Sequence, residues 1–362
     1  MSGAARPADA AGGDAFAAVR RVVGQRPDDE ATAVVVRLTG PDGRWQCASG
    51  VADLATGAAV RDDQRFRIGG VTKTFVAATV LSLAAEGRLG LDDPVRDHLP
   101  DLLPRAVTVR RLLDHTSGLA DESDVRYNDT EWFLAHRFDT FTPADLTARS
   151  LRRPLLFEPG TAQQITRANY VIAGMLVERV TGHPYADEVE ARILRPLGLT
   201  ATSLPGIDPT MPEPHVRGYD HGVDVTEHSP SIHGAAGEMI STVADLDRFL
   251  AALFAGEVLS RPWLAEMLRV PPGPYARGGP AFCGAGLDRA ELPNGLTVWG
   301  MAGIVHGCLS GIVATPDGRS RFVYLVAPTS RGGLRVPPLV QLLVTNAFAL
   351  FPPSSPGGAG CE

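Results

Sequence analysis

"RIGGVTKTFVAATVLSLAAEG", residues 67–87, changes its character within a few positions. The first residues are typical of the end of a strand. From Val71 onward apolar residues recur at helical spacing as far as Gly87, which suits a helix C-terminus. Lys73 lies near the start of this predicted helix, and Gly70 stands about one helical turn before it. The stretch therefore predicts a strand that leads directly into a helix with a lysine in its first turn.

Lys73 is the only lysine among the 34 basic residues of the chain, and the others are all arginines. An arginine side chain stays charged in proteins, whereas a lysine amine can lose its proton and act as a base or a nucleophile. The lone lysine thus indicates a position at which arginine would not serve. The alternative interpretation is a buried relic that forms an ion pair with a carboxylate.

The composition limits the classes of protein to which the chain can belong. Its 362 residues, 44% hydrophobic and 21% charged, suffice for one large domain or two interleaved domains. A net charge of −7 argues against nucleic acid or an anionic membrane surface as a partner. No run of about 18 apolar residues predicts a membrane span, and the first residues lack the apolar stretch of a secretory signal. We therefore expect a cytoplasmic protein.

The four cysteines, Cys47, Cys283, Cys308 and Cys361, are scattered and form no C-x-x-C pair. This spacing favours reduced thiols, with Cys308 as a small core residue, over a disulfide framework or a zinc site. No motif indicates a metal or an organic cofactor, so neither is expected.

Strand patterns occur near both ends of the chain. Residues 31–40 and 44–54 form a predicted hairpin around a Pro-Asp-Gly turn, and three more strands are predicted within residues 296–328. Helical patterns broken by loops fill most of residues 88–290, and a terminal helix is predicted at 336–351. The strands thus flank a helical region, which indicates one sheet closed by the two chain ends.

The expected domain organisation follows from this order. It consists of a sheet domain with terminal helices (14–68 and 291–351), a mainly helical domain that carries the Gly-Val-Thr-Lys helix (69–290), and disordered ends (1–13 and 352–362).

Several segments, taken in order from about residue 15 to 350, resemble one family. This is the serine β-lactamase and penicillin-binding-protein family, and the likeness is greatest to class C enzymes and their esterase and D,D-peptidase relatives. The resemblance implies an α+β fold of the β-lactamase/transpeptidase type, with an antiparallel sheet, flanking helices and an inserted helical domain. The segments are "FRIGGVTKTFVAATVLSLAAEGRLGLDDPVRDHLPDL", "VTVRRLLDHTSGLAD", "PLLFEPGT", "NYVIAGMLVERVTGHPYADEVEARILRPLGLTATSL" and "GEMISTVADLDRFLAALFAGEVLS".

The resemblance implies a catalytic Ser-x-x-Lys motif at a helix start. In this motif the serine attacks a carbonyl carbon and the lysine, one turn away, takes its proton. The corresponding residues here are Gly70, Val71, Thr72 and Lys73. The lysine is therefore present and the nucleophile is absent.

Two further family motifs are also altered. The Tyr-x-Asn motif corresponds to a stretch in which Ile165 replaces the tyrosine and Arg167 the asparagine. The Lys/His-Thr/Ser-Gly strand corresponds to Met301, Ala302 and Gly303, of which only the glycine fits. Hydrolysis through an acyl-enzyme is therefore not expected.

Part of the catalytic apparatus is expected to remain. The resemblance implies an oxyanion hole of two backbone N–H groups, which belong here to Gly70 and Ile304, and such a hole can stabilise an enolate. Arg167 is expected close to Lys73, where its charge, together with burial, would lower the pKa of the amine. Lys73, Gly70, Ile304 and Arg167 are thus the candidate catalytic residues.

The sequence gives weaker indications for the candidate substrate-binding residues. Ile165 and Met301 are expected to make the pocket apolar and suited to a hydrophobic small metabolite. Tyr170 is expected in a helix core, with the alternative that its hydroxyl replaces the missing one. His115 is expected to be structural.

Glu238 and His306 have two interpretations each. Glu238 could neutralise Lys73 or Arg167, or could be exposed. His306 could line the rim of the cleft or lie on the surface.

Three hypotheses of function remain open. The first is a protein of β-lactamase fold that performs non-hydrolytic acid/base chemistry, such as a cyclisation, an aldol-type step or an isomerisation in specialised metabolism, with Lys73 as acid/base. The second is a pseudoenzyme that binds a ligand or a partner protein. The third is a serine hydrolase or acyltransferase with an engineered glycine at position 70, which restoring the serine would reactivate.

Overall fold

The structure of the protein is a computed structural model that describes residues 16–41, 43–100, 102–122, 125–126, 129–330 and 338–349. The two ends for which the sequence predicts disorder lie outside these residues. In the described part of the chain, no helix combines the length and the apolar character needed to cross a bilayer.

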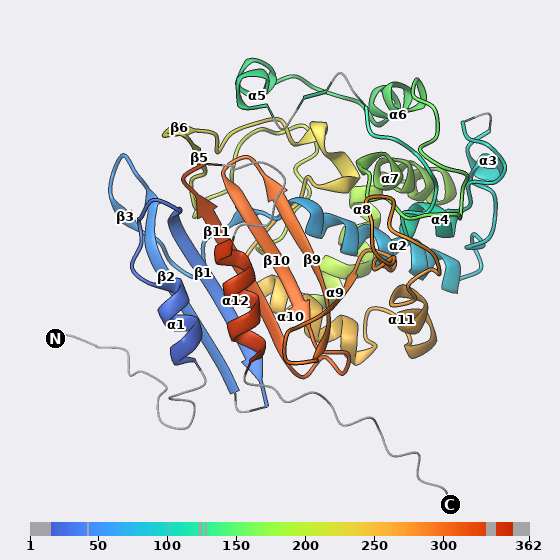
Figure 1. Ribbon diagram of the computed structural model, residues 1–362. Coiled ribbons are helices and arrows are strands. Elements are labelled where there is room, and N and C mark those ends of the chain that lie inside the picture. The colour runs from blue at the N-terminus through green and yellow to red at the C-terminus, as the bar shows by residue number, and fades with distance from the viewer. Residues whose placement is uncertain are drawn as a thin grey trace, which may run out of the picture.

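A seven-stranded antiparallel sheet forms one half of the molecule, in the order β3-β2-β1-β11-β10-β9-β8 (Figure 1). The first and last long strands, β1 and β11, are central neighbours, so the two chain ends do close one sheet. The predicted fold class and the five predicted strands are thus confirmed. The strands are β1 (Ala31–Gly40), β2 (Gly43–Asp53), β3 (Ala58–Ala59), β8 (Asp288–Glu291), β9 (Thr297–Val305), β10 (Cys308–Ala314) and β11 (Arg321–Pro328).

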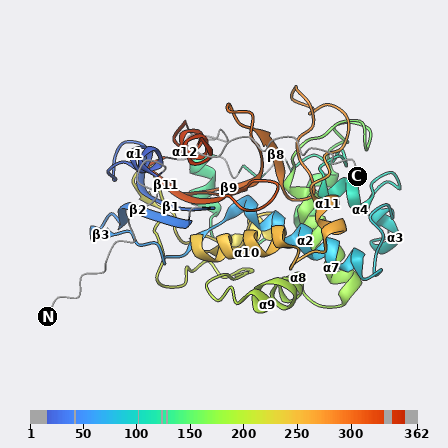
Figure 2. The same ribbon diagram turned by 90° about the horizontal axis from the view of Figure 1, so that it is seen from below.

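Helices cover both faces of this sheet (Figure 2). Val34 and Val36 of β1 point into an apolar cluster with the terminal helices α1 (Ala17–Val23) and α12 (Pro338–Phe348). Ala33 and Val35, which alternate with them, point into the main core on the opposite face. A sheet covered on both sides explains why β1 is apolar along most of its length.

The main core runs without a break from the sheet into the helical half. Helix α10 (Val243–Ala255), from the middle of the chain, packs on β1 and β11, and its Phe249 stacks on Phe75 of α2 (Thr72–Ala85) with ring centroids 3.9 Å apart. The core shows no boundary of its own at residue 69 or 290. The expected division of the chain into a sheet domain and a helical domain therefore stays a prediction.

The remaining helices are α3 (Val95–His98), α4 (Val109–Leu113), α5 (Thr130–His136), α6 (Pro143–Leu151), α7 (Arg167–Thr181), α8 (Tyr185–Val189), α9 (Arg195–Leu197) and α11 (Arg261–Met267). Of these, α3, α4, α6 and α8 pack against α7, and α7, α8 and α11 pack against α2. Two small ladders that the sequence did not indicate join β4 (Phe66–Arg67) to β7 (Ile240–Ser241) and β5 (Tyr219–Asp220) to β6 (Val223–Asp224).

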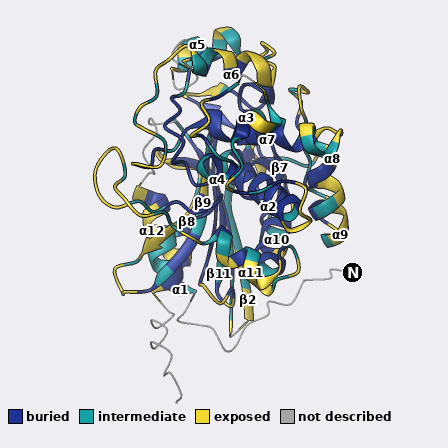
Figure 3. Cartoon of the chain, turned by 90° about the vertical axis from the view of Figure 1, so that its right-hand side faces the viewer, coloured by how far each residue is buried: buried dark blue, intermediate teal, exposed yellow. Residues whose placement is uncertain are grey.

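Helix α2 lies at the centre of the fold, and each residue from Thr72 to Leu81 is buried (Figure 3). A helix that is apolar around its whole circumference is one that has neighbours on all sides. This burial places Lys73 inside the protein.

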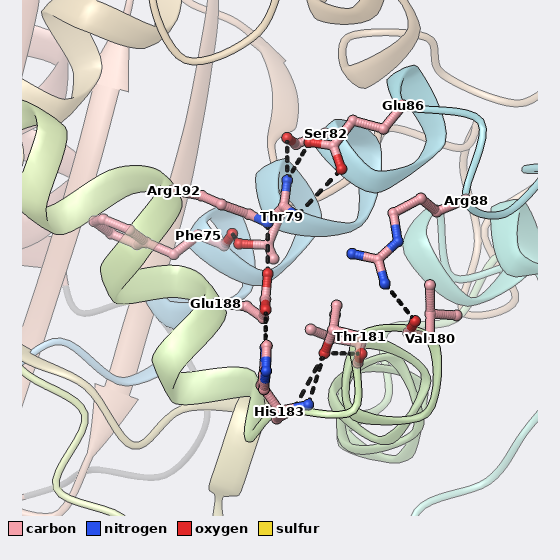
Figure 4. A network of polar contacts seen from close by, with 11 residues as sticks. Phe75, Thr79, Ser82, Glu86, Arg88, Val180, Thr181, His183, Glu188 and Arg192 are labelled. Atoms are coloured by element: carbon pink, nitrogen blue, oxygen red, sulfur yellow. Dashed lines mark hydrogen bonds and ion pairs between the residues drawn. The ribbon is translucent and has the colours of Figure 1, made fainter.

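A polar network holds the far half of α2 in place (Figure 4). Arg192, in a π-helical turn after α8, donates to Ser82 Oγ at 3.0 Å and forms an ion pair with Glu188 at 2.7 Å. Arg88, just beyond α2, donates to the carbonyl of Val180 in α7 at 2.7 Å. These contacts fix the helix that carries Lys73 against α7 and α8.

The cysteines agree with the expectation of reduced thiols. Cys47, Cys283 and Cys308 are free, and Cys308 is a buried residue of β10 whose thiol donates to the carbonyl of Arg67. Cys361 lies outside the described residues.

Candidate active site

The turn that leads into α2 requires a glycine. Gly69 begins a 3-10 turn (Gly69–Val71) with φ +48°, in the left-handed region that favours glycine. A Cβ at this position would stand 3.0 Å from the backbone nitrogen of Ile304 in β9. The turn and the edge of β9 therefore lie against each other.

Gly303 allows this close approach from the other side. A Cβ on Gly303 would stand 1.9 Å from the carbonyl oxygen of Ile68 and 2.6 Å from Ser310 Oγ. Ser310 in turn donates to the same carbonyl at 2.9 Å. The one residue of the third motif that fits the family pattern is thus needed for backbone packing.

A cavity of about 320 Å³ opens between this turn, the edge of β9 and the start of α7. Lys73 lines it with 8% of its surface exposed. Its Nζ lies 3.2 Å from the position that a Cβ on Gly70 would occupy. The other lining residues are Gly69, Gly70, Asp121, Gln164, Ile165, Thr166, Arg167, His233, Ala236, Gly237, Tyr275, Arg277, Ala302, Ile304 and Val305.

The surroundings of Lys73 favour its neutral form. Burial lowers the pKa of the amine, Asp288 and Asp121 oppose this, and Arg167 lowers the pKa further. No carboxylate of the described residues lies within 4 Å of Nζ, so Lys73 forms no ion pair there. Burial and Arg167 thus both lower the pKa of Lys73, as the sequence predicts, and burial has the larger effect.

Arg167 is held at the first position of α7. Its guanidinium pairs with the buried carboxylate of Glu122 and donates to the carbonyl of Ile232 at 2.9 Å. Its backbone N–H donates to Asp121 Oδ1 at 2.6 Å. Arg167 therefore lines the cavity as predicted, and its charge is balanced by Glu122.

Asp121 and Glu122 are residues that the sequence reasoning missed. Asp121 also accepts from the backbone N–H of Ala168 at 3.2 Å, so it caps the N-terminus of α7, where a negative charge is favoured. An Asp-Glu pair in a loop carries no motif of its own. Only the fold shows that it reaches the first turn of a helix far along the chain.

Two backbone N–H groups of the cavity wall are placed as oxyanion donors. Gly70 lies in the turn before α2, where N–H groups lack intrahelical acceptors. In β9, Val305 pairs with Cys308 across a two-residue turn, so Ala302 and Ile304 direct their backbone groups away from β10. Strand β8 pairs with β9 only as far as Gly300, which leaves Ile304 at an open edge.

The carbonyl of Ala302 occupies the space where a side chain at position 70 would start. A Cβ on Gly70 would stand 2.6 Å from Ala302 O, closer than Cβ atoms in proteins come to another non-bonded atom. A serine at this position would therefore have to displace the backbone of β9.

Tyr170 and Met301 do not reach the cavity. Tyr170 is fully buried, its hydroxyl donates to the carbonyl of Leu113 at 2.9 Å, and burial raises its pKa well above the usual value. The core alternative is thus confirmed and the substitute-hydroxyl alternative is wrong. Met301 is buried in the main core because it points to the face of β9 opposite to that of Ala302.

Glu238 and His306 also lie elsewhere. Glu238 is 3% exposed and faces a second cavity, where it accepts from the hydroxyl of Tyr185. His306 is 2% exposed, because its ring stacks on Phe133 of α5 with centroids 3.5 Å apart and its Nδ1 lies 3.4 Å from Asp220 Oδ2. Neither interpretation of either residue is correct.

The lining of the cavity is more polar than the sequence indicated. Ile165 lines it as expected, but Met301 does not, and the sequence reasoning missed Gln164, His233, Tyr275 and Arg277. The lining thus combines apolar and polar side chains, and the expectation of an apolar ligand stays a prediction.

His115 is part of the scaffold, as expected. It is 2% exposed, and burial with the nearby charge of Lys73 lowers its pKa to about 3. Its Nδ1 lies 2.8 Å from Asn169 Nδ2, and its carbonyl accepts from Gln164 at 3.0 Å. The neutral ring thus supports the segment that enters α7.

Comparison with known proteins identifies the family. The family model described as Beta-lactamase matches residues 19–343 of the chain. The chain belongs to the Beta-lactamase family. Lys73, the 3-10 turn and the edge of β9 therefore lie within a fold whose relatives include esterases, amidases and penicillin-binding proteins.

Two solved structures are similar over nearly their whole length. A D-stereospecific amidohydrolase from Streptomyces sp. is 34% identical with a TM-score of 0.82, over 92% of this chain and 98% of that one. A D-amino acid amidase from Ochrobactrum anthropi SV3 is 27% identical with a TM-score of 0.79, over 93% and 98%.

Curated relatives match over a shorter stretch. Esterase EstB from Burkholderia gladioli is 37% identical over 216 residues, which are 53% of each chain. Penicillin-binding protein 4 from Amycolatopsis lactamdurans is 31% identical over 222 residues, 56% of this chain and 54% of the relative. The chain thus spans about half the length of the curated relatives that it matches.

Proposed function

We propose that this member of the Beta-lactamase family does not form an acyl-enzyme and instead catalyses non-hydrolytic acid/base chemistry on a small carbonyl compound, with Lys73 as base. The observation that carries the proposal is the position of the Lys73 amine. It lies in a cavity, without an ion-pair partner among the described residues, next to a glycine where a nucleophile would stand. A buried amine whose pKa is lowered reaches its neutral, basic form at a lower pH than a free lysine does.

The absence of an activated nucleophile supports this proposal. Among the described lining residues, Thr166 carries the one aliphatic hydroxyl. Its Oγ1 is buried without a hydrogen-bond partner in the described part of the chain, so no base activates it.

The proposed reaction moves one proton at a time. Lys73 takes the proton α to a substrate carbonyl, the electron pair of that C–H bond moves onto the carbonyl oxygen, and the N–H groups of Gly70 and Ile304 stabilise the enolate. In an isomerisation, the Lys73 ammonium returns its proton to a carbon atom of the enolate. In an aldol-type addition or a cyclisation, the enolate carbon attacks a second carbonyl carbon, and the Lys73 ammonium protonates the alkoxide that this forms. All three reactions share the removal of the α proton by Lys73.

The substrate is proposed to carry an anionic group beside its carbonyl. Arg277, an exposed residue, lines the mouth of the cavity together with Tyr275 and Gln164. A guanidinium at a rim suits a carboxylate or a phosphate. A small oxo acid thus replaces the hydrophobic metabolite that the sequence suggested.

The test follows deuterium exchange into small 2-oxo and 3-oxo acids in D₂O by proton NMR. We expect the wild type to accelerate exchange at the α-carbon and Lys73→Met to reduce the rate to background. Exchange that survives Lys73→Met would contradict the role of the lysine. Exchange in neither protein, with ligand binding retained, would favour the pseudoenzyme.

A second experiment tests the engineered-hydrolase hypothesis. Gly70→Ser is expected to yield no covalent adduct with an activated ester or a penicillin by intact-protein mass spectrometry, because Ala302 O closes the space. Rapid acylation of Gly70→Ser would support a disabled hydrolase instead.

A further inference from the structure

A second cavity of about 230 Å³ lies between α6, α7 and α8. Its wall is shared with the first cavity. In the segment 233–238, His233, Ala236 and Gly237 line the Lys73 cavity, whereas Gly234, Ala235 and Glu238 line the second one. The two cavities therefore lie on opposite sides of one short segment, and neither the family motifs nor the proposed reaction uses the second.

The second cavity has a mostly apolar lining. The bulkier apolar and aromatic lining residues are Phe141, Leu146, Val171, Met175, Tyr185 and Ile207. Ile207 is 65% exposed, which places an apolar side chain of the lining in contact with solvent. A concave apolar surface of this kind is typical of a small-molecule site.

Two carboxyl groups interrupt this apolar lining. Glu238 is 3% exposed and accepts from the hydroxyl of Tyr185, and Glu178 of α7 accepts from the backbone N–H of Tyr185 at 3.3 Å. No residue that lines the cavity in the described part of the chain is basic. Two acids on either side of one tyrosine thus lack a positive counterpart within the cavity.

The electrostatics of the empty cavity suit a cation. Burial, with a smaller contribution from Glu178, raises the pKa of Glu238 to about 8 against the opposing effects of the Gly206 N–H and of Arg67. Burial also raises the pKa of Glu178. A bound positive charge would offset the cost of ionising both groups.

We propose that this second cavity binds a small apolar primary amine, with the ammonium between Glu238 and Glu178 and the hydrocarbon part against the apolar lining. The carboxylates accept the ammonium hydrogens, and the apolar lining excludes water from the contact. The proposal is independent of the chemistry assigned to Lys73.

The test uses isothermal titration calorimetry with 2-phenylethylamine at pH 8.5 and the isosteric neutral alcohol 2-phenylethanol. We expect the amine to bind and the alcohol to bind at least tenfold more weakly. Glu238→Gln and Glu178→Gln should each weaken amine binding at least tenfold. Glu131→Gln, on the exposed side of α5, should leave the affinity unchanged.

The pH dependence gives a second readout. Amine affinity should fall between pH 8.5 and pH 6, because Glu238 takes up a proton as the pH drops below about 8. Equal binding of alcohol and amine, unchanged affinity in both glutamine variants, or no binding of the amine would each overturn the proposal. Glu178 is partly exposed, so Glu178→Gln remains informative if Glu238→Gln fails to fold.

Discussion

Replacing Gly303 by alanine is expected to lower the free energy of unfolding by at least about 3 kcal/mol. The added Cβ would stand 1.9 Å from the carbonyl oxygen of Ile68 and 2.6 Å from Ser310 Oγ. Neither atom can move away freely. Ile68 is fully buried, and Ser310 Oγ donates a hydrogen bond to that same carbonyl. Strand β9 would have to leave the turn before α2, and the wall of the Lys73 cavity would open.

The measurement is chemical denaturation at neutral pH, with Ala302→Ser as the matched control. Ala302 is the neighbouring residue, but its side chain is exposed on the other face of β9, so the control should change stability by less than about 0.5 kcal/mol. A Gly303→Ala variant within about 1 kcal/mol of the wild type would show that β9 does not pack as described.

Replacing Lys73 by methionine is expected to abolish catalysis and to raise the free energy of unfolding by about 1–3 kcal/mol. The amine is buried without an ion-pair partner among the described residues, and methionine keeps its length without the cost of a buried charge. Activity and stability therefore change in opposite directions, as they do when a functional group is held in an unfavourable environment.

The pH dependence and a second variant make this prediction specific. Because burial lowers the folded-state pKa of Lys73 below 10.5, the charge destabilises the fold most at low pH, and this effect disappears as the pH rises towards 10.5. The stability difference between Lys73→Met and wild type should thus shrink with rising pH. Lys73→Arg should be less stable than wild type, because a guanidinium cannot lose its charge. A destabilised Lys73→Met variant would instead indicate an ion-paired relic.

The fold could be predicted from the sequence because its signals are local. Alternating and continuous apolar runs mark β1, β9, β10 and β11, and apolar residues at helical spacing after Lys73 mark α2. The strands β4 and β7 carry no such pattern, since the ladder between them has only two residue pairs.

The sequence predicts the candidate site only for those residues whose positions follow from a single helix or strand. Lys73 and Gly70 share one helical turn, and Ile304 follows directly on the third motif, so these three residues do line one cavity. The prediction for Met301 fails because its side chain packs into the main core, whereas the neighbouring Ala302 lines the cavity and its carbonyl oxygen faces position 70.

His306 and Glu238 show a different limit. His306 is buried because α5, from a distant part of the sequence, places Phe133 on the hairpin turn. Glu238 faces away from Lys73 because the residues of the segment 233–238 divide between two cavities. Contacts of this kind depend on tertiary packing, which no local pattern encodes.

The pKa of Lys73 tests the central claim most directly. As the only lysine, it can be followed in the intact sequence by the pH dependence of trace acetylation, measured by peptide mass spectrometry in the native and the denatured chain. We expect a native pKa below 10.5, raised by Arg167→Gln and lowered further by Asp288→Asn. A native pKa at or above that of the denatured chain would contradict a Lys73 amine poised to act as a base.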